Sequence, residues 1–140
     1  MPANQPPLII TCSESKVRKY MRDYYSSVLK LPQDLDSCPI IANAGGIKLF
    51  LRPIAPDGGL VIYNLFYCLL NQVSDFAKLG FSRVLLINHS DCNEYGGKNA
   101  FPSRDMETEK HLADLRVMKD DLQTYSPFPL EIEAHYVFID

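Results

Sequence analysis

The sequence predicts an α/β fold: a mostly parallel sheet of about four or five strands with helices on both faces. Short runs rich in Leu, Ile and Val alternate with longer apolar or amphipathic segments. The order reads strand, helix, strand, helix, strand, helix, strand, which produces parallel strands joined by right-handed crossovers. With 140 residues, of which 46% are hydrophobic, we expect a single domain over residues 1–140.

The first half of the chain contains two predicted strands, a predicted helix and an extended segment. They are, in order, a short strand over residues 8–12, a helix from residue 13 or 15 to about residue 31, a buried strand over residues 39–43 and an extended segment over residues 47–52. Ser13 and Ser15 are candidate helix caps, and Pro32 stops the helix. The turn Gly45-Gly46 ends the second strand.

The second half contains two predicted helices and two predicted strands. They are a helix over residues 60–79, a strand over residues 83–89, a helix over residues 105–125 and a strand over residues 131–140. Gly80 stands where a left-handed helix cap belongs. The strand over residues 83–89 is continuously apolar, as expected of a parallel strand covered on both faces. The last strand alternates between apolar and polar side chains, which places it near a sheet edge.

Composition argues against several classes of function. The net charge is −3 with both signs scattered along the chain, unlike the basic patch of a nucleic-acid-binding protein. The longest strongly apolar stretch, residues 61–70, is too short to span a membrane, and residues 1–7 lack the features of a secretion signal. We therefore expect a cytoplasmic protein with neither nucleic acid nor membrane as partner. Its four cysteines are then free thiols or metal ligands.

Two short segments carry residues that bind metals. Cys12 follows the first strand, and His89 and Cys92 follow the third. Each signal alone is ordinary, because a buried thiol or a loop histidine is common. Sites in open α/β sheets form beyond the carboxyl ends of the strands, so the three side chains are expected to converge there. Two thiolates and one imidazole form a three-ligand set that lets zinc keep an open fourth position for water.

These segments resemble motifs of the β-class carbonic anhydrases. That family has Cys-x-Asp-x-Arg after its first core strand and His-x-x-Cys after a later one; here the matching residues are Cys12-x-Glu14-x-Lys16 and His89-Ser90-Asp91-Cys92. Residues 41–46, Ile-Ala-Asn-Ala-Gly-Gly, are similar to the family's Asn-Ala-Gly segment. The resemblance implies a lyase that interconverts carbon dioxide and bicarbonate, with zinc held by Cys12, His89 and Cys92. It also implies a homodimer or a dimer of dimers.

Glu14 and Lys16 depart from the family's aspartate and arginine. By the resemblance, Glu14 would accept a hydrogen bond from zinc-bound water, and Lys16 would keep Glu14 ionised and oriented. Glutamate reaches further than aspartate by one carbon–carbon bond, about 1.5 Å. Lysine lacks the planar fork with which arginine holds a carboxylate at two points. The charge pair is therefore kept and its geometry is changed.

Two other functions compete with the hydratase. Glu14 would close the site if it bound zinc itself, leaving a zinc-containing binding or regulatory module. Cys12-x5-Arg18 also matches the anion loop of cysteine phosphatases, but residues 13–17 contain no glycine, and Glu14 would put a negative charge in the loop. The remaining cysteines and histidines are interpreted as structural: Cys68 in the core, Cys38 half-buried, His111 on the surface and His135 on a solvated strand face.

Overall fold

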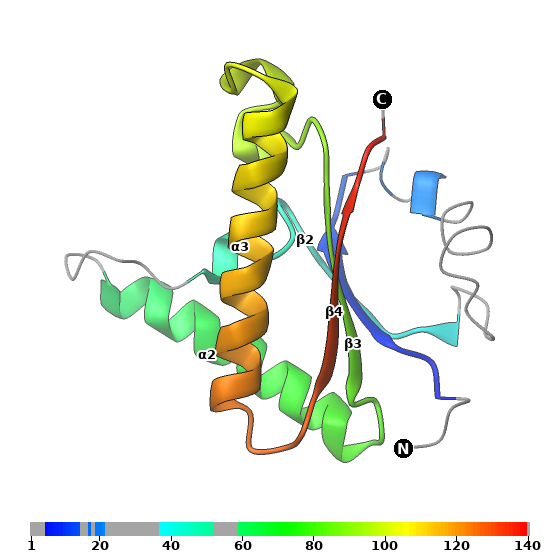
Figure 1. The fold of residues 1–140 in the computed structure, drawn as a ribbon. Coiled ribbons are helices and arrows are strands. Elements are labelled where there is room, and N and C mark those ends of the chain that lie inside the picture. Colours follow the sequence, from blue (N-terminus) through cyan, green and yellow to red (C-terminus); the bar gives the residue numbers. More distant parts are fainter. Residues whose placement is uncertain (1–4, 15–16, 18, 22–36, 52–58, 140) are drawn as a thin grey trace.

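The structure is a computed structural model that describes residues 5–14, 17, 19–21, 37–51 and 59–139, with the backbone alone for residues 59–64 (Figure 1). Its strands are β1 (Leu8–Cys12), β2 (Ile40–Asn43), β3 (Arg83–His89) and β4 (Glu131–Val137). The long helices are α2 (Gly59–Lys78) and α3 (Arg104–Tyr125), and the short 3-10 helices are η3 (Lys48–Phe50), η4 (Asn93–Tyr95) and η5 (Lys98–Ala100). The predicted α/β fold is thus confirmed.

The four described strands form one parallel sheet in the order β2-β1-β3-β4. The chain goes from β1 outward to β2, and then returns past β1 to β3 and β4. The strand order therefore reverses between β1 and β3, and parallel sheets bind ligands beyond the carboxyl ends of strands at such a reversal. Every residue of β1 is buried, as are residues 84–89 of β3, which fits their continuously apolar sequences.

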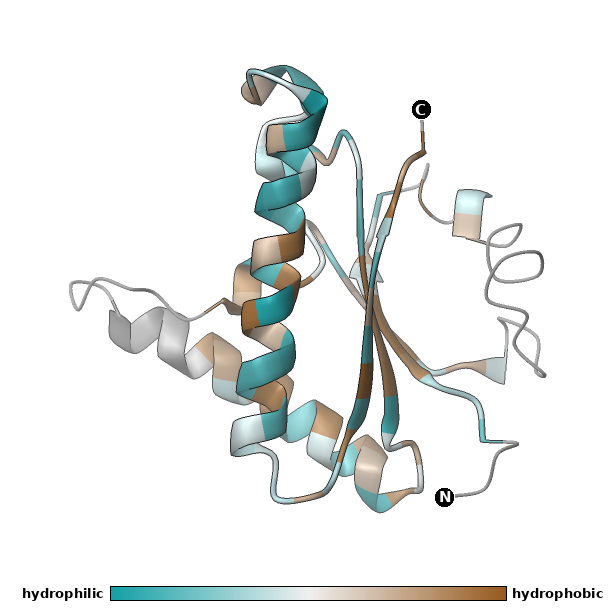
Figure 2. Cartoon of the chain, in the orientation of Figure 1, coloured by the Kyte–Doolittle hydropathy of each residue, from teal (hydrophilic) through white to brown (hydrophobic). Residues whose placement is uncertain are grey.

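Helical segments cover both faces of the sheet (Figure 1). On one face, Leu8 and Leu86 pack with residues of α2 and α3, among them Phe66 and Met118. On the other face, Ile9 and Leu85 pack with Val17 and Met21. Residues 17 and 19–21 are helical, as predicted, and the rest of that expected helix lies outside the described residues. Apolar residues line the centre of the sheet between the two layers (Figure 2).

Gly80 ends α2 in the left-handed conformation predicted for it, with φ +99°. Its N–H donates to the carbonyl of Ala77, and the N–H of Phe81 donates to the carbonyl of Phe76. The Phe76 and Phe81 rings meet edge to face with centroids 6.1 Å apart. This pair of hydrogen bonds with an apolar contact is the Schellman motif, which satisfies carbonyls at the helix end.

The segment after Gly46 differs from the prediction. Residues 47–52 were expected to be extended, but Lys48–Phe50 forms η3, and Leu51 alone is described as extended. Ile47 and Phe50 are both buried, three positions apart, while Lys48 and Leu49 are exposed. Residues three positions apart lie on the same side of a 3-10 helix, so a helical turn, and not a strand, points both side chains into the core.

Three burial predictions for strands and cysteines are also wrong. The second strand was expected to be buried, but β2 lies at a sheet edge, and Ile40 is 44% exposed. Cys68 was assigned to the core but is exposed on α2, and Cys38 was expected to be half-buried but is buried. Apolar composition does not reveal which side of a nearly all-apolar helix faces the sheet. In the part of the chain that is described, no helix combines the length and hydropathy needed to cross a bilayer.

Candidate metal centre

Four potential ligands converge beyond the carboxyl ends of β1 and β3. Cys12 is the last residue of β1 and His89 the last residue of β3, while Glu14 and Cys92 lie in the loops that follow. One ligand atom from each of the four lies within 4.8 Å of all the others. The Sγ atoms of Cys12 and Cys92 are 4.0 Å apart, and Nε2 of His89 is 3.3 Å from Oε2 of Glu14. The structure therefore brings together residues that are up to 80 positions apart in the chain.

The size of this cluster fits a tetrahedral zinc ion. With Zn–S bonds of about 2.3 Å and Zn–N or Zn–O bonds of about 2.0 to 2.1 Å, a tetrahedron has edges of about 3.8 Å between sulfurs and about 3.3 Å between nitrogen and oxygen. The observed separations are 4.0 Å for the sulfur pair and 3.3 Å for the nitrogen–oxygen pair. These two edges agree with the tetrahedron to a few tenths of an ångström, and the remaining separations do not exceed 4.8 Å, so the donor set and its size suit a zinc ion.

The His89 ring presents Nε2 to the cluster. Its Nδ1 lies 2.7 Å from the carbonyl oxygen of Ser90, and a carbonyl only accepts, so Nδ1 carries a hydrogen. Nε2 is therefore the nitrogen that can bind a metal, and it lies 3.3 Å from Oε2 of Glu14. A ring nitrogen and a carboxylate oxygen at this distance need a proton or a cation between them, and a metal ion would supply the positive charge.

The two thiols are held in different protonation states. The pKa of Cys12 is lowered, first by the hydrogen bond with the Cys92 thiol, then by the His89 ring and by the backbone N–H groups of Glu14 and Gly45. The same sulfur–sulfur hydrogen bond, together with burial, raises the pKa of Cys92. One thiolate and one thiol therefore share a proton in the metal-free pair. A bound zinc would displace that proton, because it binds cysteine as thiolate.

Gly45 supplies a backbone donor to the cluster. Its N–H donates to Sγ of Cys12 at 3.4 Å, and its φ is +78°. A Cβ added at this position would lie 2.7 Å from Cβ of Glu94, so the turn needs glycine both for its conformation and for its space. The sequence singled out this segment by its similarity to a family motif. The structure shows its physical contribution, which is a hydrogen bond to the sulfur.

Glu14 connects the two loops. Its Oε1 accepts the N–H of Asn93 at 2.8 Å, while its Oε2 faces the His89 ring. One carboxylate therefore touches both the backbone after Cys92 and the histidine. The other two residues assigned a role near Cys12, Lys16 and Arg18, lie outside the described residues.

A buried polar network behind the cluster was missed by the sequence analysis. The Asn88 side-chain NH₂ lies 3.3 Å from the Tyr95 hydroxyl and 3.0 Å from Nδ1 of His111, and the Tyr95 hydroxyl donates to Asp114 at 2.8 Å. His111 was expected at the surface but is fully buried, and burial lowers its pKa to about 4. The available signal was the helical spacing of Glu107, His111 and Asp114, which share a face with apolar Leu115 and Met118.

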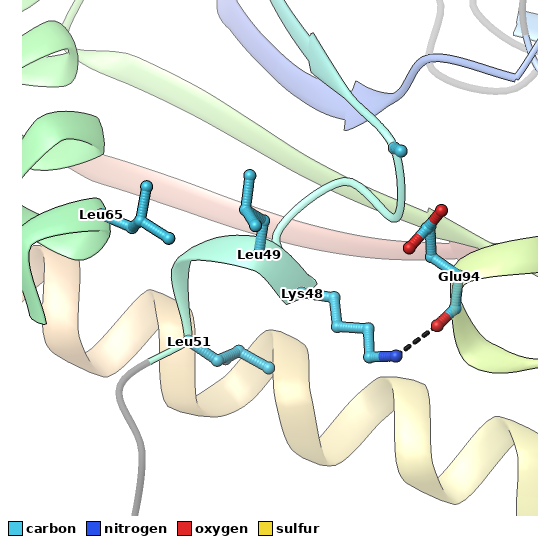
Figure 3. A pocket seen from close by; sticks show the side chains of 6 residues that line it. Lys48, Leu49, Leu51, Leu65 and Glu94 are labelled. Carbon is cyan, nitrogen blue, oxygen red and sulfur yellow. Dashed lines mark hydrogen bonds between the residues drawn. The ribbon is translucent and has the colours of Figure 1, made fainter. Parts of the chain in front are cut away.

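A pocket of about 270 Å³ lies beside the loops that carry the cluster (Figure 3). It is lined by Ala44, Lys48, Leu49, Leu51, Leu65 and Glu94. Ala44 adjoins Gly45, and the Lys48 ammonium donates to the carbonyl of Glu94, two residues after Cys92. The pocket walls are mainly apolar, and its two charged residues come from the elements next to the ligand loops.

Comparisons with known proteins support the fold. No protein-family model and no curated protein sequence matches this chain. Among solved structures, it is similar to the crystal structure of β-carbonic anhydrase isoform I from the protozoan Trichomonas vaginalis. The TM-score is 0.57 at 11% sequence identity, and the match covers 97% of this chain and 80% of the other. At this identity the likeness establishes a shared fold and leaves the activity to be argued from the site.

Proposed function

We propose that this protein is a zinc-dependent carbonic anhydrase, a lyase that interconverts carbon dioxide and bicarbonate, with Cys12, His89 and Cys92 as the zinc ligands. The observation that carries the proposal is the convergence of these ligand atoms, with Glu14, within 4.8 Å of one another. They meet at the strand-order reversal of a sheet whose fold is shared with a β-carbonic anhydrase. A single cytoplasmic domain that assembles as a homodimer or dimer of dimers is part of the same proposal.

Zinc held there would act as a Lewis acid that makes water a nucleophile near neutral pH. The chain contributes the remaining functions. Gly45 donates a hydrogen bond to the Cys12 sulfur, and the Ser90 carbonyl accepts from Nδ1 of His89, which leaves Nε2 as the nitrogen that would bind the metal. Glu14, aligned by the Asn93 N–H, offers its second oxygen as a hydrogen-bond acceptor at the place where water would be activated. Lys16 is proposed to keep this carboxylate ionised.

A second candidate is favoured by one distance. The 3.3 Å between Nε2 of His89 and Oε2 of Glu14 equals the edge of a coordination tetrahedron. Glu14 could therefore be the fourth ligand, which would leave a closed Cys₂-His-Glu site. In that case the protein would be a zinc-stabilised binding or regulatory module without hydratase activity.

Metal analysis combined with stopped-flow carbon dioxide hydration separates these functions. The hydratase proposal expects about one zinc per chain and hydration that increases with pH, since two thiolates neutralise the zinc charge and leave its water less acidic than in an all-histidine site. A zinc-loaded protein that is inactive even at alkaline pH, but becomes active as Glu14→Ala, supports the closed site. A purified protein that takes up no zinc contradicts both.

A further inference from the structure

Helix α3 contacts the loop between the two ligands His89 and Cys92. Glu107, in the first turns of α3, is fully buried, and its Oε2 accepts the N–H of Asp91 at 2.8 Å. Asp91 lies between the ligands and has φ 54°, the one positive φ outside glycine among the described residues. L-residues adopt this conformation reluctantly, so the peptide needs a contact that holds it in place.

The burial of the Glu107 carboxyl group costs free energy that packing alone does not require. Glu107 lies on the face of α3 that also buries Leu115 and Met118 against the sheet. Its Oε1 has no hydrogen-bond partner among the described residues. Burying a polar group with half of its acceptor capacity unused is unfavourable, and an apolar side chain of similar size would pack without that cost. The contact with Asp91 is therefore the specific contribution of the carboxyl group.

The same helix holds the other side of His89. One turn after Glu107, His111 lies 3.0 Å from the side-chain amide of Asn88. Its ring is packed between the rings of Tyr95 and Tyr136, with centroids 4.0 and 4.9 Å away. The residues that α3 contacts, Asn88 and Asp91, thus flank His89 and precede Cys92. The helix thus contacts residues next to the ligands, in a loop where the Asp91 side chain also accepts the Lys98 N–H at 2.8 Å.

We propose that Glu107 is a positioning residue that sets the spacing of His89 and Cys92 and thereby the affinity for zinc. The inference rests on the proposed zinc site. Without the acceptor, the Asp91 peptide would relax from its left-handed conformation, and the two ligands would move from tetrahedral positions. Loss of such an outer contact typically weakens metal binding about 10- to 100-fold.

Three variants test the proposal: Glu107→Leu, which fills the same volume without an acceptor, Glu107→Gln, which keeps an acceptor oxygen, and Glu109→Leu, a control at an exposed position of the same helix. For each, zinc affinity is measured by competition with a chelator, and the cobalt(II) form is examined by its visible absorption spectrum. Urea unfolding of the zinc-depleted proteins records stability separately from metal binding.

We expect Glu107→Leu to unfold at nearly the parent urea concentration, to bind zinc about 10- to 100-fold more weakly and to show an altered cobalt spectrum. Glu107→Gln should retain most of the parent affinity, and Glu109→Leu all of it. Parent-like affinity and spectrum in Glu107→Leu would overturn the proposal while leaving the zinc site intact. A parent protein that binds neither metal would overturn the proposed function and this inference together. If Glu107→Leu fails to fold, the test rests on Glu107→Gln, which keeps an acceptor oxygen. A Glu107→Gln protein that binds zinc about 10- to 100-fold more weakly than the parent would then overturn the proposal.

Discussion

Substituting Gly45 by alanine probes the turn that delivers a backbone N–H to the Cys12 sulfur. Two costs add at this position. The left-handed φ of +78° is unfavourable for alanine by about 1 kcal/mol. The new Cβ would also lie 2.7 Å from Cβ of Glu94, and carbon atoms pack at about 3.5 to 4.0 Å, so the two loops must move apart. Overpacking of this kind costs about 1 to 3 kcal/mol, for a total near 2 to 4 kcal/mol.

Gly80→Ala is the matched control. Gly80 has a similar positive φ of +99°, but its added Cβ would come no closer than 3.5 Å, to the Gln5 side chain, which is an ordinary contact. It lies at the end of α2, before the amino end of β3, whereas the proposed ligands lie at or beyond the carboxyl ends of the strands. The control therefore carries the conformational cost alone, about 1 kcal/mol.

Urea unfolding of both zinc-depleted variants gives the stability difference, and chelator competition gives the zinc affinity. We expect Gly45→Ala to lose at least 1 kcal/mol more than Gly80→Ala, and to bind zinc about tenfold more weakly because its N–H is displaced from the sulfur, which corresponds to about 1.4 kcal/mol. Equal stability losses would show that the contact with Glu94 is relieved at no cost. Equal zinc affinities would show that the hydrogen bond to Cys12 is unimportant for metal binding.

Three further predictions concern the cluster and the network behind it. Cys12→Ser and His89→Ala should each abolish zinc retention, and full occupancy by metal analysis would refute the ligand assignment. Glu14→Asp combined with Lys16→Arg should raise the hydration rate in stopped-flow assays. Burial holds the pKa of His111 near 4, against about 6.5 when unfolded, so only the unfolded chain gains its proton as pH falls between these values. Stability should therefore fall by up to about 3 kcal/mol over that range, and His111→Gln should flatten this acid limb in urea unfolding.

The sheet could be predicted from the sequence because its inner strands are almost purely apolar. Val84, Leu86 and their neighbours leave no polar face, which requires cover on both sides, and the intervening helical segments require parallel strands. The meeting of Cys12 with the residues after β3 follows from the same topology, since carboxyl ends of parallel strands share one edge. The strand order itself is a tertiary property, and for that reason β2 was not recognised as an edge.

The helical spacing of Glu107, His111 and Asp114 indicates a shared face, but it does not show that this face is buried, because the burial of a polar residue depends on partners elsewhere in the fold. His111 lies beside an apolar stripe, and its sequence neighbours are compatible with exposure. Asn88 in β3 and Tyr95 in η4 supply the polar partners with which this face of α3 is buried. Cys68 shows the converse, because its helix is so apolar that composition cannot say which side faces solvent.

The glutamate at position 14 bears directly on how active the site can be. Its Oε1 accepts the Asn93 N–H, and its Oε2 lies 3.3 Å from Nε2 of His89, which is the separation expected of two ligands on one zinc ion. The longer side chain therefore makes both contacts at once. Moving it off a bound zinc would require breaking the Asn93 hydrogen bond, and a charge-assisted bond contributes about 1.5 to 3 kcal/mol. If Glu14 does close the site, this hydrogen bond lowers the population of the open form about 10- to 100-fold relative to a carboxylate that lacks it. The observed hydration rate then falls by the same factor. Slow hydration that accelerates when the side chain is shortened would therefore point to closure by Glu14, and not to a defect in the zinc ligands.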